Sequence, residues 1–262
     1  MMRLATCMLA CLLGTAAAAQ DARDPHDLTG FWSPVNEQPP MDPDMLAHVP
    51  ENTVVLDDAG FVEYPPGEFG PLDVKPEARA EAMKWQPAEA LTLQNVCATP
   101  SVIYTMQGPF PFEIHQTSDV LVFKLEYFDQ VRVVYMDGRG HPPADAPHSI
   151  LGHSTGRWEG DELVIDTTHI APSTLTNNGL DHSAGVHFVE RYKLSADGKS
   201  LKSTQWFEDA AVLNNAGVRY MEWSAKPGEY VYPYSCDPTF AVDYSQVVKG
   251  EDMSSEEFET IK

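Results

Sequence analysis

Histidine is unevenly distributed along this sequence of 262 residues. Seven of the nine histidines fall in one stretch: His115, His141, His148, His153, His169, His182 and His187. Three of them lie within residues 137–155, the longest connection in the region with strand patterns. Long loops on a rigid scaffold commonly carry binding and catalysis. Because an imidazole beside a carboxylate can abstract a proton, this stretch predicts general acid–base chemistry.

Charged residues interrupt several apolar runs in the same region. Glu113 and His115 are two positions apart, so they project from one face of a strand. Buried charges need partners, and we expect Glu126 to pair with Arg132 or Arg191. Such pairs either line a cavity or tie the strands together, and the sequence leaves both alternatives open.

Roles can be assigned to the members of this set. The general base is expected to be His153 or His141, with Asp166 orienting a histidine. Arg132 is expected to hold the developing anion, and His182 to complete the catalytic cluster. The residues expected to contact substrate are His115, Glu126, Tyr135, Trp158, His187 and Arg191. This chemistry requires no cofactor, and none is predicted.

Metal binding is the alternative interpretation of these histidines. The ligands would come from His141, His148, His153, His182 and an acid such as Asp181. The sequence contains no H-E-x-x-H motif and no other tight ligand spacing. The metal-free interpretation is therefore favoured.

Several function classes are disfavoured by charge and by motif. The formal net charge of −22 repels nucleic acid and anionic membrane surfaces. There is no G-x-S-x-G elbow, no phosphate-binding loop and no G-x-G-x-x-G motif. We expect a small-molecule substrate, without nucleic acid or membrane partners. The sequence does not indicate an oligomeric state.

Short apolar or alternating runs separated by turn residues begin near residue 101 and predict strands. The predicted strands are 101–106, 112–116, 120–127, 131–136, 162–169, 186–194, 200–208, 218–224 and 229–234. Most connections are short enough for hairpins, which join antiparallel neighbours. The pattern predicts a mainly β protein, either an antiparallel, lipocalin-like barrel or a strongly curved sheet.

The ends of the chain differ in composition from this β region. Residues 1–19 are typical of a signal peptide cleaved after Ala19, which predicts export to the periplasm. A lipobox-like Met8–Cys11 segment is the alternative. Residues 20–94 are proline-rich and are expected to wrap irregularly over the core, with one helix at Lys75–Trp85. Residues 95–248 would form the barrel and 249–262 a flexible acidic tail.

Two cysteines remain after removal of the signal peptide, Cys97 and Cys236. In an exported protein we expect them to form a disulfide, and two buried free thiols are the alternative. A catalytic thiol is disfavoured because neither cysteine has a cationic neighbour in sequence that would lower its pKa.

Several motifs resemble a family of exported, mostly uncharacterised bacterial proteins that are abundant in soil and aromatic-degrading bacteria. The resemblance covers residues 27–237, beginning with D-L-T-G-F-W at 27–32, and G-H-S-T-G-R-W-E-G-D-E-L-V-I-D-T at 152–167 is its most specific stretch. Motif positions by resemblance are Arg132, Asp137, Arg139, His141, His153, Asp166, His182, Glu190 and Arg191. His115 and His169 depart from the pattern, which suggests substrate-specific roles for them. The resemblance also implies a cysteine near each end of the β region.

Together these features predict a periplasmic, cofactor-independent lyase or isomerase. Its substrate would be small and aromatic or hydrophobic, for example a lignin-derived phenolic, and its role would lie in the catabolism of aromatic compounds. A non-catalytic periplasmic binding barrel and a metal-dependent hydrolase are the alternatives.

Overall fold

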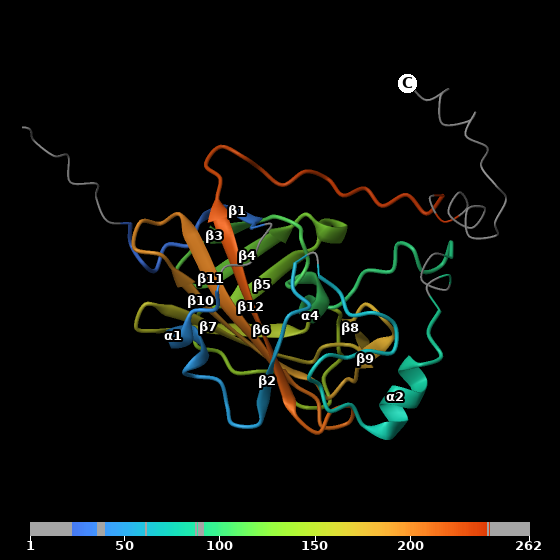
Figure 1. Ribbon diagram of the computed structural model, residues 1–262. Coiled ribbons are helices and arrows are strands. Elements are labelled where there is room, and N and C mark those ends of the chain that lie inside the picture. Colours follow the sequence, from blue (N-terminus) through green and yellow to red (C-terminus); the bar gives the residue numbers. More distant parts are fainter. Residues whose placement is uncertain are drawn as a thin grey trace, which may run out of the picture.

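The computed structural model describes residues 23–35, 40–60, 62–86, 88, 92–239 and 241. The predicted signal peptide and acidic tail lie outside these residues. The described chain is organised around one closed β-barrel (Figure 1), so the predicted fold class is confirmed. Within this part of the chain, no helix is long and apolar enough to cross a membrane.

Nine strands close the barrel. Their spatial order is β1 (Gly30–Pro34), β3 (Phe112–Gln116), β4 (Val120–Leu125), β5 (Val131–Tyr135), β6 (His153–Glu159), β7 (Glu162–Thr168), β10 (His187–Leu194), β11 (Ser200–Glu208) and β12 (Ala216–Ala225). Neighbouring barrel strands are antiparallel except β5 and β6, which pair in parallel at Val134–Ser154 and Tyr135–Thr155.

The barrel consists of two antiparallel groups of strands that meet at two joints. One group is β3, β4 and β5, and the other is β6, β7, β10, β11 and β12. At the first joint β1 lies between the groups, with Phe31 opposite Glu113 and Trp32 opposite Ala225. At the second joint β5 lies beside β6. Parallel neighbours require a crossover connection, and residues 136–152 provide it.

The interior of the barrel is packed with side chains. Burial alternates strictly along β10, as expected for a strand with one face on the core. Phe112, Phe123, Tyr192 and Trp223 contact one another with ring centroids between 5.2 and 6.1 Å apart. Complete burial of one such side chain stabilises the fold by roughly 1.5–3 kcal/mol. The barrel core therefore supplies much of the stability.

The N-terminal segment is more regular than its sequence predicts. Besides β1 it contains α1 (Pro43–Leu46), β2 (Thr53–Leu56) and α2 (Pro76–Ala82), the last of which lies within the predicted helix. β2 pairs in parallel with β12, outside the closed barrel. The prediction of an irregular wrap missed β1, a five-residue strand that begins with glycine and ends with proline, two residues disfavoured in strands.

Two predicted strands are absent. Residues 101–106 contain α4 (Val102–Thr105), because a short buried apolar run suits a helix as well as a strand. Residues 229–234 form no strand, since side chains rather than a neighbouring strand bind their backbone: Val231 N donates to Glu113, and Tyr234 N donates to Asp129.

Two short strands and one turn lie outside the nine-stranded ladder. β8 (Ser173–Thr176) pairs with β9 (Leu180–His182) in a separate two-stranded sheet. A turn of 3-10 helix, η1 (Tyr127–Asp129), connects β4 to β5.

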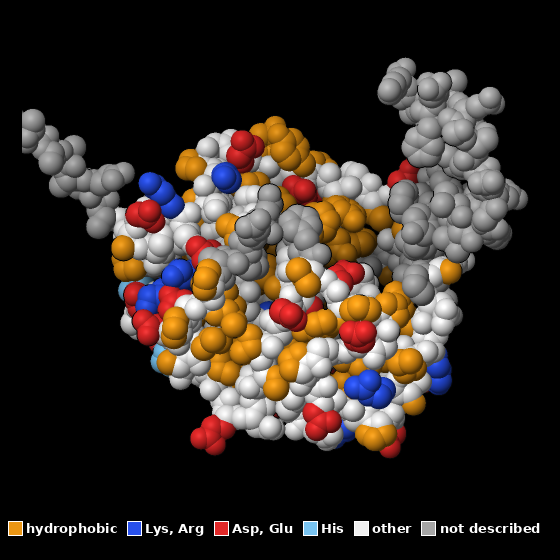
Figure 2. All heavy atoms as spheres, in the orientation of Figure 1, with side chains coloured by type: hydrophobic (Ala, Val, Ile, Leu, Met, Phe, Trp, Pro, Cys, Tyr) orange, Lys and Arg blue, Asp and Glu red, His pale blue; other side chains and the backbone are white. Residues whose placement is uncertain are grey.

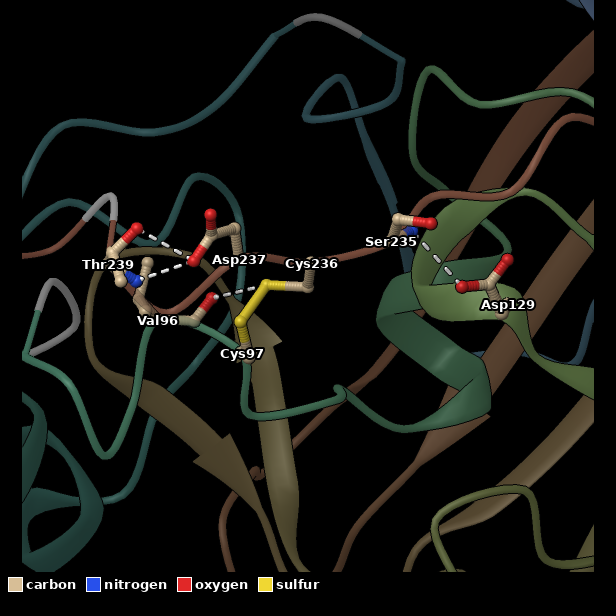
Figure 3. The surroundings of a disulfide bond; sticks show 7 residues. All are labelled: Val96, Cys97, Asp129, Ser235, Cys236, Asp237 and Thr239. Carbon is tan, nitrogen blue, oxygen red and sulfur yellow. Dashed lines mark hydrogen bonds between the residues drawn. A yellow bond between two sulfur atoms is a disulfide. The ribbon is translucent and has the colours of Figure 1, made fainter.

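A disulfide fastens the segment that follows β12. This segment, residues 229–239, is named the strap, and it leaves the end of β12 and crosses one end of the molecule (Figure 1). Cys236 is bonded to Cys97, with 5.9 Å between their Cα atoms, so the predicted pairing is confirmed. Nearby, the Asp129 carboxylate accepts a hydrogen bond from the backbone N–H of Ser235 at 3.2 Å (Figure 3). The strap is therefore held at two adjacent points.

Candidate functional site

The outer face of β6, β7 and β10 carries polar residues that the sequence singled out. Asp166 of β7 lies opposite Thr155 of β6 and opposite Val189 of β10. Because side chains alternate along each strand, His153 on β6 and His187 on β10 project from the same face as Asp166. The site therefore lies outside the barrel rather than in an enclosed chamber.

The crossover at residues 136–152 adds a third histidine to this face. Its return path is held against the end of β7: His169 Nε2 lies 2.9 Å from the Pro143 carbonyl oxygen. Gly152 has a φ of +64°, and a Cβ there would lie 2.6 Å from the Thr168 carbonyl oxygen. Glycine therefore permits the tight approach that returns the chain to β6, and the crossover places His141 over Thr155.

His153, His141 and Asp166 form a hydrogen-bond chain. The two Nδ1 atoms of the histidines are 3.3 Å apart, and His141 Nε2 lies 3.1 Å from Asp166 Oδ1. Because a carboxylate only accepts, His141 donates from Nε2 and, when neutral, accepts at Nδ1 from His153. The lone pair of a neutral His153 is then on Nε2, a nitrogen for which no hydrogen bond was found within the described part of the chain.

Asp166 also binds His187. His187 Nε2 lies 3.0 Å from Asp166 Oδ1, and its Nδ1 lies 3.7 Å from Glu208. The Trp206 ring meets the His187 ring edge-on, with centroids 5.7 Å apart. His187 is thus placed between two carboxylates, and one carboxylate oxygen serves two histidines.

The pKa values of His153 and His187 are shifted in opposite directions. Burial lowers the pKa of His153, and the charges of His141, His169 and Arg139 lower it further. The hydrogen bond to Asp166 raises the pKa of His187 and, with the charges of both carboxylates, outweighs its burial. The pKa of His153 is therefore below, and that of His187 above, the ordinary value for a histidine.

Burial alone would raise the pKa of Asp166, but hydrogen bonds and charges from its two histidines outweigh burial. The pKa of this carboxyl group is consequently lowered. Asp166 is therefore an acceptor and an orienting group rather than a proton donor.

Tyr135 and Arg139 form a wall beside the base. The Tyr135 ring stacks on His153 with centroids 5.2 Å apart, and the Arg139 guanidinium lies 3.8 Å from the Tyr135 ring centroid. Arg139 also forms a bidentate pair with Asp137. These hydrogen bonds lower the pKa of Asp137 to about 2. The wall combines an aromatic face with a cation.

A small hollow lies on the same outer face and includes Asp166 in its lining. Its volume is about 170 Å³. Val164, Val189 and Trp206 supply apolar surface, Arg191 reaches it, and the segment 48–50 covers it. An apolar cavity of about 150 Å³ can accommodate benzene. The hollow therefore matches one aromatic ring.

Ion pairs border this hollow. Arg191 contacts Glu159 at 2.8 Å and Glu162 at 3.1 Å, not the expected Glu126. Lys193 contacts Asp161 at 3.3 Å. Figure 2 shows acidic and basic side chains gathered on the side of the molecule where α1 lies in Figure 1. The border of the hollow therefore carries charges of both signs.

Arg132 lies inside the barrel, away from the histidines. Its side chain is 1% exposed and is paired with Glu190. It also donates to Thr167 at 2.9 Å and to Ser154 at 3.2 Å, while the Tyr192 hydroxyl donates to Glu190 at 2.7 Å. The predictions that Arg132 holds a substrate anion and pairs with Glu126 are not supported by this position. Instead, this network ties β5 to β6, β7 and β10.

His182 is also separate from the cluster it was expected to join. It is buried on β9, with Nε2 2.8 Å from Ser101 Oγ and Nδ1 3.0 Å from the Ser183 carbonyl oxygen. Both ring nitrogens therefore have structural partners, and burial lowers its pKa.

Three residues predicted to contact substrate lie elsewhere on the barrel. His115 is on β3, where it pairs with Glu113 at 3.1 Å. Trp158 is near the far end of β6 and contacts His26, with ring centroids 4.4 Å apart. Glu126 directly precedes η1. These three residues contact neither the histidine chain nor the hollow beside Asp166. Of the predicted site residues only Asp166 and Arg191 line the hollow; His141, His153, His187 and Tyr135 lie beside Asp166 but not in the lining of the hollow.

Sequence reasoning missed four residues of this face: His48, Arg157, Trp206 and Glu208. The alternation along β11 contained a signal, because Trp206 and Glu208 are two positions apart and share a face. Using that signal requires knowing that β11 lies beside β10. His48 comes from the N-terminal segment, and no local pattern places it here.

Among the described residues, no group of three or more His, Cys, Asp or Glu side chains is arranged to hold a metal ion. The geometry instead presents one open imidazole nitrogen, an oriented carboxylate and an adjacent hollow. A scan against protein-family models, a search of curated proteins and a search of solved structures each found no match for this chain.

Proposed function

We propose that this protein is a cofactor-independent lyase or isomerase that removes a carbon-bound proton from a small aromatic substrate. The general base is His153. The observation that carries this proposal is the chain from Asp166 through His141 to His153, which orients the base and leaves its Nε2 open. A base oriented in turn by further groups is a recurring arrangement in enzymes that use an imidazole as general base.

The proposed reaction begins with transfer of a carbon-bound proton of the substrate to His153. His153 Nε2 takes the proton, and the electron pair of the broken C–H bond stays on the substrate. In a lyase this pair forms a double bond as a neighbouring group leaves; in an isomerase a proton returns to a different carbon. The His153 imidazolium then donates to His141, which donates to Asp166, so the new positive charge faces a carboxylate.

The hollow and the wall define the substrate class. In this proposal an aromatic ring occupies the 170 Å³ hollow against Trp206. Tyr135 and His153 stack on each other and do not line the hollow, so the substrate must extend past Asp166 to bring its reacting group to the base. Lignin-derived phenolics have this combination of ring and side chain. The N-terminal sequence, the disulfide and the resemblance to exported proteins support a periplasmic location.

Deuterium exchange provides a test that does not require knowledge of the product. The protein is incubated in D₂O with one-ring phenolic carboxylates and two-ring lignin-type phenolics, and loss of C–H signals is followed by proton NMR. We expect exchange or elimination with at least one compound, and a rate about 10²–10⁴-fold lower in His153→Ala. Because the base must be neutral and its pKa is lowered, the rate should rise with pH through a value below 6.5.

The control variant is His26→Ala, which removes an exposed histidine near the opposite end of β6. It should retain the wild-type rate. An equal rate in His153→Ala would contradict the role of His153. Saturable binding of a phenolic without exchange or product would identify a carrier and would contradict turnover.

A further inference from the structure

A second, larger hollow lies apart from the histidine chain. It is bordered by Gly60, Val62 and Glu63, by the segment from α4 to Phe110, by η1 and by the strap. Its volume is about 320 Å³, which falls within the range of small-molecule sites. It shares no lining residue with the hollow beside Asp166. We name it the aromatic hollow.

Among the described residues, four aromatic side chains line the aromatic hollow. Phe110 and Tyr127 are stacked with centroids 4.4 Å apart. Tyr234 stands nearly perpendicular to both, at 5.6 Å and 5.5 Å, and Tyr104 lies 6.4 Å from Tyr127. Rings at right angles form a corner that offers π surface from more than one direction. Such surfaces attract cations, because the face of an aromatic ring carries partial negative charge.

One carboxylate completes the lining. Glu63 accepts a hydrogen bond from the Tyr104 hydroxyl at 2.6 Å and from the Asn177 amide at 2.9 and 3.0 Å. Both donors are neutral, and none of the ion pairs found in the described part of the chain involves Glu63. These contacts fix the position of the carboxylate without neutralising its charge.

The tyrosine hydroxyls of the lining add no charge of their own. Burial raises the pKa of Tyr104, as does its hydrogen bond to Glu63, and burial raises the pKa of Tyr127 to about 12. Both hydroxyls are therefore neutral at physiological pH. Glu63 is the one formally charged residue among the described lining residues. An anionic ligand would be repelled, whereas a cation with apolar surface would satisfy both the rings and the carboxylate.

We propose that the aromatic hollow binds a small organic cation of the quaternary ammonium type. Methylated ammonium groups carry a diffuse charge and little hydration, which suits a site made of π faces and one fixed carboxylate. The strap contributes Tyr234, whose backbone N–H donates to Asp129 at 2.9 Å. With the disulfide two residues further on, this contact preorganises the wall before a ligand arrives.

Calorimetric titration of the full chain tests this site with choline and with its neutral isostere, 3,3-dimethylbutan-1-ol. We expect choline to bind at one site per chain and the neutral alcohol to bind at least tenfold more weakly. Glu63→Gln should weaken choline binding about tenfold and reduce the difference between the two probes. Tyr127→Leu should weaken choline binding at least as much.

Tyr232→Leu serves as the matched control, because Tyr232 is an exposed tyrosine on the same strap and does not line the hollow. It should bind choline as the wild type does, and circular dichroism should show that all variants are folded. Equal affinity for choline and the alcohol, or unchanged choline binding in Glu63→Gln, would overturn the proposal. The assay involves no turnover, so its outcome is independent of the histidine site.

Discussion

One oxygen atom of Asp166 connects the two halves of the candidate active site. It accepts from His141, which leads to the proposed base, and from His187, which leads toward Glu208. The pKa of His187 is raised mainly by this carboxylate, whereas the pKa of His153 is lowered mainly by burial. Opposite shifts in neighbouring histidines are typical of sites in which one group gives and another takes a proton.

Replacing Asp166 with asparagine should uncouple these histidines. The amide keeps the shape but removes the negative charge, so the pKa of His187 should fall toward its ordinary value near 6.5. In the wild type, the stabilisation from protonated His187 is fully present below pH 6.5 and is lost as pH rises through the raised pKa. That pH dependence should shrink in Asp166→Asn. Histidine ring NMR titrations and urea unfolding at several pH values measure both effects.

His26 provides the internal reference in the same spectra, because it contacts Trp158 rather than the site. The Asp166→Asn substitution should leave the ring signals of His26 unchanged. If the titration of His187 were the same in both proteins, Asp166 would not be the cause of its raised pKa.

The sequence predicted which residues belong to the candidate site better than it predicted which residues they contact. His141, His153, Asp166 and His187 converge, and Tyr135 packs beside them. Residue type and local spacing say nothing about which face of a strand is inward. Arg132 was for that reason placed with the histidines, although it faces the core.

At the scale of elements, the crossover between β5 and β6 determines the site. The crossover returns along the outer face of the barrel, where His141 contacts Thr155 of β6 and Asp166 of β7. Two of its glycines differ sharply in their surroundings. Gly152 has positive φ and backbone close to its Cα, whereas a Cβ at Gly140 would meet nothing within 4 Å.

Alanine at these two glycines should therefore have different effects. Gly152→Ala should destabilise the protein by roughly 2–4 kcal/mol, because its positive φ is unfavourable and the Thr168 carbonyl cannot move freely. Gly140→Ala should change the free energy of unfolding by less than about 0.5 kcal/mol. Urea denaturation measures both. Similar stability of the two variants would show that the return of the crossover is loosely packed.

The sequence predicted some barrel strands and missed others. Strands with apolar alternation, such as β10 and β11, were found with nearly correct limits. β6 was missed because its sequence, H-S-T-G-R-W-E, has a glycine at its centre and no apolar alternation. Its place is fixed by Gly156, which lets Met136 and Val134 approach closely. Tertiary packing of this kind is invisible to a local pattern.

At the scale of the whole molecule, a buried polar network spans the barrel core. Arg132 and Glu190 are almost completely buried, and Tyr192, Thr167 and Ser154 supply further hydrogen bonds, although one guanidinium nitrogen of Arg132, Nη1, is buried without a hydrogen-bond partner among the described residues. Desolvation offsets much of the attraction within such a pair. We therefore expect the pair to favour one register of these strands, because a shifted register would leave Arg132 or Glu190 buried and unpaired.

Removing one partner of the buried Arg132–Glu190 pair should destabilise the protein far more than breaking an ion pair on the surface. Glu190→Ala should destabilise the protein by about 3–5 kcal/mol, since Arg132 would remain buried and unpaired. Glu81→Ala breaks the exposed pair with Lys84 on α2 and should cost less than about 0.5 kcal/mol. Thermal and urea unfolding give both values. Comparable losses would mean that water reaches the network.

The parallel joint between β5 and β6 also bears on the order of folding. Hairpins within each group of strands form from local contacts, whereas this joint has only two residue pairs and must wait for the crossover to close. We therefore expect nascent chains to acquire most of their hydrogen-bonded ladder before His141 can reach Asp166. The contact between these two side chains would then form late, and a species trapped before the joint closes would be protected in its hairpins but would lack the assembled histidine chain.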